Sequence, residues 1–414
     1  MKKQSAVFLQ AYIQPDKIEA LTELLNTGGN PLWPDSFFPF EKLETVHFAR
    51  WIIAPKTNKF KASLIYSGNV DGSAEQHLED LSKQFSEALD AILSHCEGYP
   101  KKEGITASSR LAYLQKHSFK TPTFYVGAPN RTVSQIRNEA KLHKAVKNYV
   151  RENRSEWRTG REAYHDIQRF LEADPQWDWA RNKYELPKKK PLKMLLAVLL
   201  ILVLLPFLMV LVLLIFLFYE LPSKSTAKTI NEISVEKMAK LQEHEDIIYQ
   251  NQLSQVFETK SGLRKLMLHL LLWVTNYGAK NWFVKGQLFG TPTIHFARWV
   301  FIDGGKRFVF FSNFDGTYDG YLSDFVDNNG WGLNAIYGAA KGYPKTFFVF
   351  GGGSYRFLKF LGWGRQTQVA TPIWYSAYPW SSLPQIINKS ELRVALFSDD
   401  DPSDEEIDKL LHRI

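Results

Sequence analysis

The pattern of apolar and polar residues predicts the same order of strands and helices in both halves of the chain. In the N-terminal half it predicts strands at residues 6–13, 47–54, 61–67 and 123–127, and helices at 15–25 and 73–95. In the C-terminal half it predicts strands at 253–257, 294–302, 307–312 and 373–376, and helices at 263–283 and 318–337. Each half therefore has the predicted order β-α-β-β-α-β.

Near-identical segments relate the two halves. Residues 45–51, Thr-Val-His-Phe-Ala-Arg-Trp, recur at 293–299 as Thr-Ile-His-Phe-Ala-Arg-Trp, and the Asn-Val-Asp-Gly of residues 69–72 recurs at 313–316 as Asn-Phe-Asp-Gly. Such repeats, kept in register, indicate a duplication. The predicted fold class is α+β, with two tandem ferredoxin-like (βαββαβ) repeats whose open sheet faces close on each other as an intrachain pseudo-dimeric α+β barrel.

An uncharged apolar block separates the two repeats. Residues 194–219 are 26 residues without a charged side chain, more than the roughly 20 that a helix needs to cross a bilayer. Pro206, near the middle, leaves two topologies open. A kinked helix would cross once and place the halves on opposite sides, whereas a re-entrant hairpin turning at Pro206 would keep them on one side. Packing of the two sheets against each other favours the hairpin.

A second apolar run, residues 266–274, lies in the predicted first helix of the second repeat. It is too short to span a bilayer, and it is flanked by Arg264 and Lys280. With Trp273 and Trp282, such a helix suits a membrane interface. The alternative is a helix buried against the sheet.

Charge is distributed unevenly around these segments. The formal net charge is +8, and residues 131–193 alone hold 16 Lys and Arg against 9 Asp and Glu. Because basic residues beside a bilayer are attracted to anionic headgroups, we expect membrane lipid as a partner and no nucleic acid. The lysines before the apolar block indicate a cytoplasmic N-terminal flank, and the single Cys96 agrees with a reducing compartment.

These features divide the chain into five predicted parts. They are repeat 1 at residues 1–130, a basic helical connector at 131–190, a membrane segment at 191–222, repeat 2 at 223–397 and an acidic C-terminal tail at 398–414. The connector is expected to form two amphipathic helices, around residues 136–149 and 167–171. The tail is expected to be solvated.

The repeated strand and turn carry the candidate chemistry. His47 and His295 are candidate ligand-binding residues, and Arg50, Arg298, Asp71 and Asp315 are candidate catalytic residues. Alternation along a strand predicts His and Arg on opposite faces, and a pseudo-twofold axis could bring two His or two Arg together. In a purely structural interpretation, each His is hydrogen-bonded within its sheet and each Arg pairs with a carboxylate such as Asp71 or Asp315. In each Asp-Gly turn the Asp, or the Ser73 or Thr317 beside it, then caps the following helix.

The Gly-Asn-Val-Asp-Gly of residues 68–72 resembles the Gly-x-x-Asp-Gly pattern of dye-decolourising peroxidases, which belong to the dimeric α+β barrel superfamily. That resemblance implies a haem cofactor with Asp71 and Arg50 on its distal side, and by repetition Asp315 and Arg298. The family also needs a proximal His for the iron. No His after Asp71 stands in a matching motif.

Taken together, the His-Phe-Ala-Arg-Trp strand, the Asn-x-Asp-Gly turn and the Thr-Pro-x-x-Tyr strand resemble a family of bacterial membrane-associated proteins without an assigned activity. This resemblance implies the duplicated fold and a place at the bacterial inner membrane, with the soluble domains in the cytoplasm. Two functions remain open. One is a membrane-attached, peroxidase-like oxidoreductase with a site at the repeat interface, and the other is a non-catalytic binding or scaffolding protein for an apolar ligand, lipid or protein partner.

Overall fold

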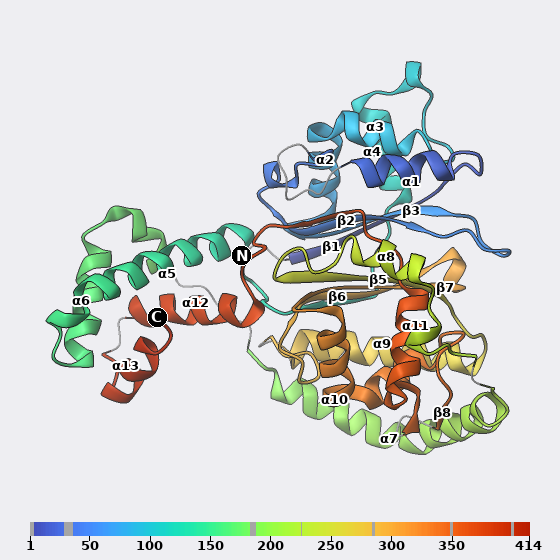
Figure 1. The fold of residues 1–414 in the computed structure, drawn as a ribbon. Helices are drawn as coiled ribbons and strands as arrows, with labels where there is room; N and C mark the ends of the chain where they lie inside the picture. Colours follow the sequence, from blue (N-terminus) through green and yellow to red (C-terminus); the bar gives the residue numbers. More distant parts are fainter. Residues whose placement is uncertain are drawn as a thin grey trace.

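The computed structural model describes residues 4–28, 36–182, 188–224, 226–283, 286–347, 351–398 and 401–414. Its centre is a pair of four-stranded antiparallel sheets (Figure 1). The first sheet has the order β1 (Gln4–Tyr12), β3 (Ser63–Asp71), β2 (Val46–Ala54), β10 (Ile373–Ser376). The second has the order β4 (Thr123–Val126), β6 (Ile294–Ile302), β7 (Arg307–Asp315), β5 (Gln250–Glu258). The chain is thus a mixed α+β protein, and each predicted strand is present.

Each sheet takes its edge strand from the other half of the chain. Strand β4 pairs with β6, where Thr123 lies opposite Trp299, and β10 pairs with β2, where Ile373 lies opposite Trp51. The prediction that each half completes its own four-stranded sheet is therefore wrong. Alternation specifies that a segment is a strand and which face it buries, but not the edge with which it pairs.

Helices cover the outer face of each sheet. The first sheet is covered by α1 (Ile18–Thr27), α2 (Ala74–Gln84), α3 (Ser86–Leu93) and α4 (Ala107–His117). The second is covered by α9 (Leu263–Asn281), α10 (Tyr318–Tyr337) and α11 (Phe357–Thr367), with α8 (Val235–Gln242) and the hairpin β8 (Thr346–Phe347) and β9 (Gly351–Gly352) nearby. The single helix predicted at residues 73–95 is interrupted at Phe85, whose ring packs edge-on against Phe38 and Phe40.

The inner faces of the two sheets contact each other. Phe8, Ile52 and Ile65 of the first sheet form one buried cluster with residues of the second, including Val300 and Phe311. The rings of Phe8 and Phe311 lie 6.2 Å apart. Since each fully buried side chain of this kind contributes about 1.5–3 kcal/mol, this cluster holds the halves together.

A helical lobe stands to one side of the sheets (Figure 1). It consists of α5 (Val133–Asn153), α6 (Gly160–Glu172), α12 (Leu383–Leu396) and α13 (Asp404–Leu411). The two amphipathic helices predicted in the connector are α5 and α6. Their apolar faces form a core with the C-terminal helices, in which Leu142, Ile167, Leu392 and Ile407 are buried. The tail is therefore not solvated as predicted, because Ile407 and Leu410 of α13 are covered by the lobe.

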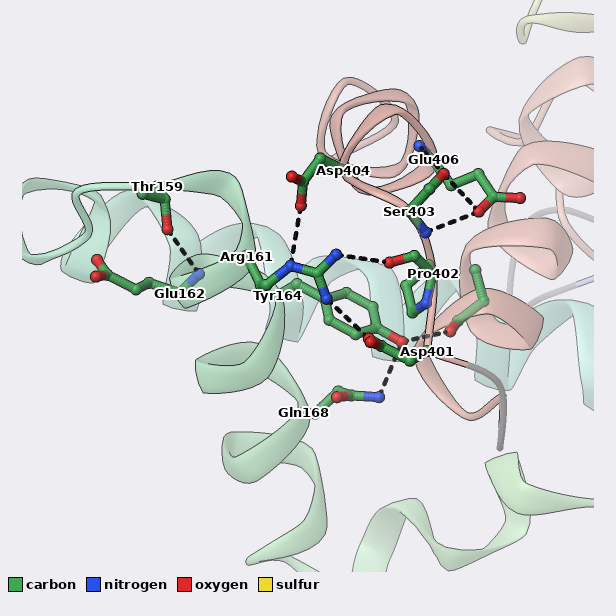
Figure 2. Close-up of polar contacts among 11 residues, drawn as sticks. Thr159, Arg161, Glu162, Tyr164, Gln168, Asp401, Pro402, Ser403, Asp404 and Glu406 are labelled. Atoms are coloured by element: carbon green, nitrogen blue, oxygen red, sulfur yellow. Dashed lines mark hydrogen bonds and ion pairs between the residues drawn. The ribbon is translucent and has the colours of Figure 1, made fainter.

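Arg161 of α6 holds the tail against the lobe (Figure 2). Its guanidinium donates to Asp404 and Asp401, each at 2.9 Å, and to the carbonyl oxygen of Pro402 at 3.0 Å. Ser403 caps α13, and the Ser403 amide donates to the Glu406 carboxylate at 2.9 Å. An acidic helix N-terminus thus faces a cation on a neighbouring helix.

Helix α7 (Pro191–Ile215) continues through Pro206 and ends in a π-helical turn, Phe216–Glu220. In the part of the chain that the structure describes, Pro191–Glu220 is the one helix long and apolar enough to cross a membrane. The hairpin predicted to turn at Pro206 is absent, because the helix remains continuous there. One internal proline costs about 3 kcal/mol, a modest loss in a helix of this length.

Helix α7 lies antiparallel to α9 along the base of the second half (Figure 1). At its start, the Lys190 amide donates to the carbonyl oxygen of Asn281 at 2.9 Å. At its end, the Leu263 amide donates to the hydroxyl of Tyr219 at 3.2 Å. Both ends of the apolar helix are therefore tied to the same folded body.

Candidate functional site

The repeated His and Asp residues meet in pairs. Asp71 Oδ1 lies 3.0 Å from His47 Nε2, and Asp315 Oδ1 lies 2.7 Å from His295 Nε2. The hydroxyl of Tyr378 lies 2.8 Å from His47 Nδ1, and its ring centroid is 6.1 Å from that of His295. The two pairs thus lie on either side of one tyrosine.

The aspartates connect this centre to the helical lobe. The other carboxylate oxygen of Asp71 accepts from the Val133 amide at 2.8 Å, and that of Asp315 accepts from the Leu383 amide at 2.7 Å. Val133 and Leu383 begin α5 and α12, so each aspartate caps a helix far from it in sequence. Caps of this kind contribute about 0.5–2 kcal/mol.

The helices that directly follow the repeated Asp-Gly turns have other caps. Ser73 accepts from the Gln76 amide of α2, and Thr317 accepts from the Gly320 amide of α10. The interpretation in which Ser73 and Thr317 act as caps is correct. The aspartates themselves reach the lobe instead.

Two glutamines complete the symmetric arrangement. The Gln4 amide donates to the carbonyl oxygen of Arg131 at 2.8 Å, and the Gln250 amide donates to that of Ser381 at 2.6 Å. The first residues of β1 and β5 thus fix the turns that lead into α5 and α12. Sequence reasoning missed both glutamines, although they begin the equivalent strands of the two halves.

Arg50 crosses from the first sheet to the second. It donates to the carbonyl oxygens of Leu253 and Ser312 at 2.8 and 2.9 Å, to the Ser254 hydroxyl at 3.0 Å and to the Asn313 side-chain oxygen. All four acceptors belong to β5 and β7. The guanidinium therefore joins the two sheets through neutral acceptors.

Arg298 crosses in the opposite direction. It donates to the carbonyl oxygens of Val7 and Gly68, each at 2.6 Å, and to the Asn69 side-chain oxygen. Neither arginine has a carboxylate partner among the described residues, so the expected pairing of the arginines with Asp71 or Asp315 is wrong. Each guanidinium instead faces main-chain and side-chain oxygens on two strands of the opposite sheet, and these oxygens are its acceptors.

The expected separation of His and Arg onto opposite faces is also wrong. Pairing of β2 with β3 shifts register between Val46 and Phe48, which interrupts the alternation at His47. As a result the His47 ring lies 5.3 Å from Phe296 of the opposite sheet, toward which Arg50 also points. The same shift occurs between Ile294 and Phe296 in the second half.

Burial controls the electrostatics of this centre. Burial lowers the pKa of Arg50 well below its ordinary value, and the nearby Arg298 lowers it further. Burial lowers the pKa of Arg298 to about 9. Burial, together with Asp71 and Asp315, raises the pKa of Tyr378. The phenol therefore remains protonated, and its hydroxyl and Asp71 Oδ1 occupy the two ring nitrogens of His47.

The geometry does not fit a haem site. Asp71 and Arg50 do not meet, because Asp71 bonds His47 and α5 whereas Arg50 bonds the second sheet. Both ring nitrogens of His47 are engaged, and the six predicted site residues are each less than 10% exposed. Among the described residues, no cluster of three or more His, Cys, Asp or Glu side chains is placed to hold a metal ion.

Comparisons with family models, curated proteins and solved structures return no match to this chain. Most polar groups of the site connect one part of the fold to another. Its arrangement is that of a structural junction between two sheets and a helical lobe.

A second notable surface is formed by α7 and α9. Val203 and Phe207 of α7 are 70% and 74% exposed, and Leu266 and Trp273 of α9 are also exposed. The opposite side of α9 packs into the core through Leu272 and its neighbours. The two interpretations of the 266–274 run, interfacial or buried, therefore apply to opposite faces of one helix.

Basic and aromatic residues lie at both ends of this surface. At the start of α7 the Lys189 ammonium lies 4.5 Å from the ring centroid of Trp282. Beyond its end the Lys345 ammonium lies 5.4 Å from the ring of Phe347. Such pairs are typical of the headgroup region of a bilayer.

Proposed function

We propose that this protein is a non-catalytic binding or scaffolding protein that is anchored in one leaflet of a membrane by α7. The observation that carries the proposal is a helix without a charged side chain from residue 194 to 219 that is exposed along its length and tied at both ends to one folded body. Apolar patches above about 300–600 Å² are rare on soluble monomers, and they commonly mark membrane or protein contacts. Immersion in lipid removes this surface from water.

The same contacts favour a helix that lies in the plane of the bilayer rather than across it. A crossing α7 would carry its neighbour α9 into the hydrocarbon, with His269 exposed near the middle of that helix, whereas Lys280 adjoins Asn281 at the headgroup end of α7. An ionisable side chain within the hydrocarbon is costly. With α7 in the plane, these groups and the lysines at both ends of α7 remain at the headgroups.

The remainder of the proposal concerns fold and location. We interpret the two halves as ferredoxin-like repeats that close on each other as an intrachain α+β barrel with exchanged edge strands. The barrel and lobe would then lie on the same side of the membrane, which we place in the cytoplasm at the bacterial inner membrane. Lys188, Lys189, Lys190 and Lys193 would contact anionic lipid there.

Liposome flotation of the full chain tests the anchoring. The wild-type protein should float with vesicles that contain phosphatidylglycerol, and the double variant Val203→Glu, Phe207→Glu should partition at least about tenfold less. A matched double variant, Val235→Glu with Ile247→Glu, places two carboxylates at exposed positions outside α7 and should float like the wild type. Equal flotation of all three proteins would show that α7 is not the membrane anchor.

A second measurement tests the non-catalytic part. Haemin added to the purified protein should give no stoichiometric Soret band, because the candidate ligands are buried and bonded to each other. A Soret band that disappears in His47→Ala would instead favour the oxidoreductase.

A further inference from the structure

A cavity of about 140 Å³ lies where the end of α7 meets α9 and α10. Its walls are Val212 and Ile215 of α7, Met267 and Leu271 of α9, and Ala335 of α10. Its one polar end is the ion pair between Glu220 and Arg264. The cavity is therefore an apolar chamber with a single charged wall.

The charged wall is fixed by its own partners. Glu220 and Arg264 are each buried, and the Thr346 hydroxyl donates to Glu220 at 2.9 Å. Arg264 Nε is buried and has no hydrogen-bond partner among the described residues. The pair closes the chamber on the side of β8. The opposite walls are continuous with the exposed apolar surface of α7.

We propose that this cavity binds the end of a linear acyl chain supplied by the membrane. The inference rests on the proposed function, since an acyl chain reaches this cavity from the bilayer only if α7 lies in lipid. Apolar cavities of about 150 Å³ accept small hydrocarbons the size of benzene, so this chamber takes a few terminal carbons and leaves the rest of the chain along α7. The terminal methyl of an acyl chain cannot form a hydrogen bond with the buried ion pair. The ion pair therefore forms the end wall of the cavity and limits how deeply the chain enters.

Photocrosslinking in reconstituted vesicles tests this site with the full chain. A fatty acid and a phosphatidylcholine, each with a diazirine near the end of one chain, are the probes. Both carry the same acyl chemistry, and the probe that labels the protein identifies the source of the chain. In the wild type we expect label on Met267 or Leu271, and competition by excess unmodified lipid of the same kind.

Two variants make the result specific. Ala335→Leu fills the cavity and should reduce label at Met267 and Leu271 by about tenfold or more. Val274→Phe adds a larger side chain on the exposed side of α9 and should leave the label unchanged. If Ala335→Leu does not fold, competition in the wild type still decides, because label that excess lipid does not displace overturns the site.

Failure of this inference is distinct from failure of the membrane proposal. A wild-type protein that floats with vesicles but carries label only on outward positions of α7, such as Phe207, has an anchor and no acyl site. Undiminished label at Met267 and Leu271 in Ala335→Leu would likewise show that the cavity is not an acyl site. A protein that does not float contradicts both.

Discussion

Arg50 and Arg298 are the residues that most directly couple the two sheets. Each is buried, each donates to oxygens of the opposite sheet, and each also lies near an aromatic ring, Phe311 for Arg50 and Phe124 for Arg298. The repeated motif identified both arginines as important. It could not identify their partners, because these are mostly main-chain oxygens that any sequence supplies.

Replacement of Arg50 by Met should destabilise the fold by about 2–4 kcal/mol, because it leaves buried acceptors without a donor. Urea unfolding of the full chain measures this change. Lys61→Met is the control, since the exposed Lys61 side chain pairs with Glu97 and lies 5.8 Å from the Tyr12 ring centroid, and its loss should change stability by less than about 1 kcal/mol. Equal stability of Arg50→Met and the wild type would contradict the role of Arg50 as a tie between sheets.

The double variant Arg50→Met, Arg298→Met should cost more than the sum of the two single variants. Arg298 lowers the pKa of Arg50, so the two guanidiniums repel each other. Each single variant removes that repulsion and so loses less stability, whereas the double variant can remove it only once. A double-mutant cycle in urea measures the coupling. Additive or less than additive losses would show that the two cations do not repel.

His77 gives the first half a pH-dependent stability. Its Nε2 lies 2.7 Å from the Tyr66 hydroxyl, and burial lowers its pKa from 6.5 to about 3. Below pH 6.5 the unfolded chain therefore binds a proton that the folded chain excludes, and stability falls as pH falls from 6.5 toward 3. At pH 5 the loss should be about 2 kcal/mol relative to pH 7.5.

His77→Gln should remove this dependence while it retains a partner for Tyr66. Urea unfolding at pH 7.5 and pH 5 gives the change in unfolding free energy for the variant and for the wild type. The contributions of other titrating groups are common to both proteins and cancel in the difference. The same pH dependence in both proteins would exclude His77 as its source.

At the scale of elements, the sequence predicted most of the helices and strands but fewer of the pairings between strands. The strand at Ile294–Ile302 and the helix at Tyr318–Tyr337 have the predicted bounds, because their apolar periodicity is strong. The exchange of β4 and β10 was not predicted, and neither were α4 and α11, which precede these strands. Both exchanged strands were predicted correctly as strands, but their periodicity does not specify a partner. Strand β4 runs on to Gly127, whose amide donates to the His295 carbonyl oxygen at 2.7 Å. An added Cβ at Gly127 would lie 2.3 Å from the Ile294 carbonyl oxygen.

Release of α13 should follow the loss of Arg161. Arg161→Ala removes the contacts to Asp401, Asp404 and the Pro402 carbonyl, so α13 should exchange its amide hydrogens faster while the strands keep their protection (Figure 2). Hydrogen exchange read by mass spectrometry measures this. Arg169→Ala, which removes an exposed ion pair within α6, is the control. Unchanged exchange in α13 would mean that Ile407 and Leu410 alone hold it.

At the scale of the whole molecule, the duplication predicted a paired architecture, whereas hydropathy could not predict the direction of α7. A helix that is apolar on all sides has no face that sets its orientation. The orientation comes from contacts at its ends, the Lys190 amide with Asn281 and Tyr219 with Leu263. The helix is continuous where the hairpin was predicted, and our proposal replaces the single span by a helix in the plane of the membrane.

Membrane depth along α7 tests the central claim most directly. Spin labels are attached to cysteines introduced singly at exposed positions, Val198, Val203, Phe207, Val210 and Leu217, in vesicles that contain phosphatidylglycerol. The native Cys96 does not interfere, because it is buried and burial raises its pKa to about 12. Power-saturation electron paramagnetic resonance then gives each depth.

We predict similar depths at all five positions, in the outer part of one leaflet, about 5–10 Å below the headgroups. A crossing helix would instead give depths that rise to a maximum near Val203 and Phe207 and fall toward opposite surfaces, over a span of about 30 Å. That profile would contradict an α7 lying in the plane of the membrane.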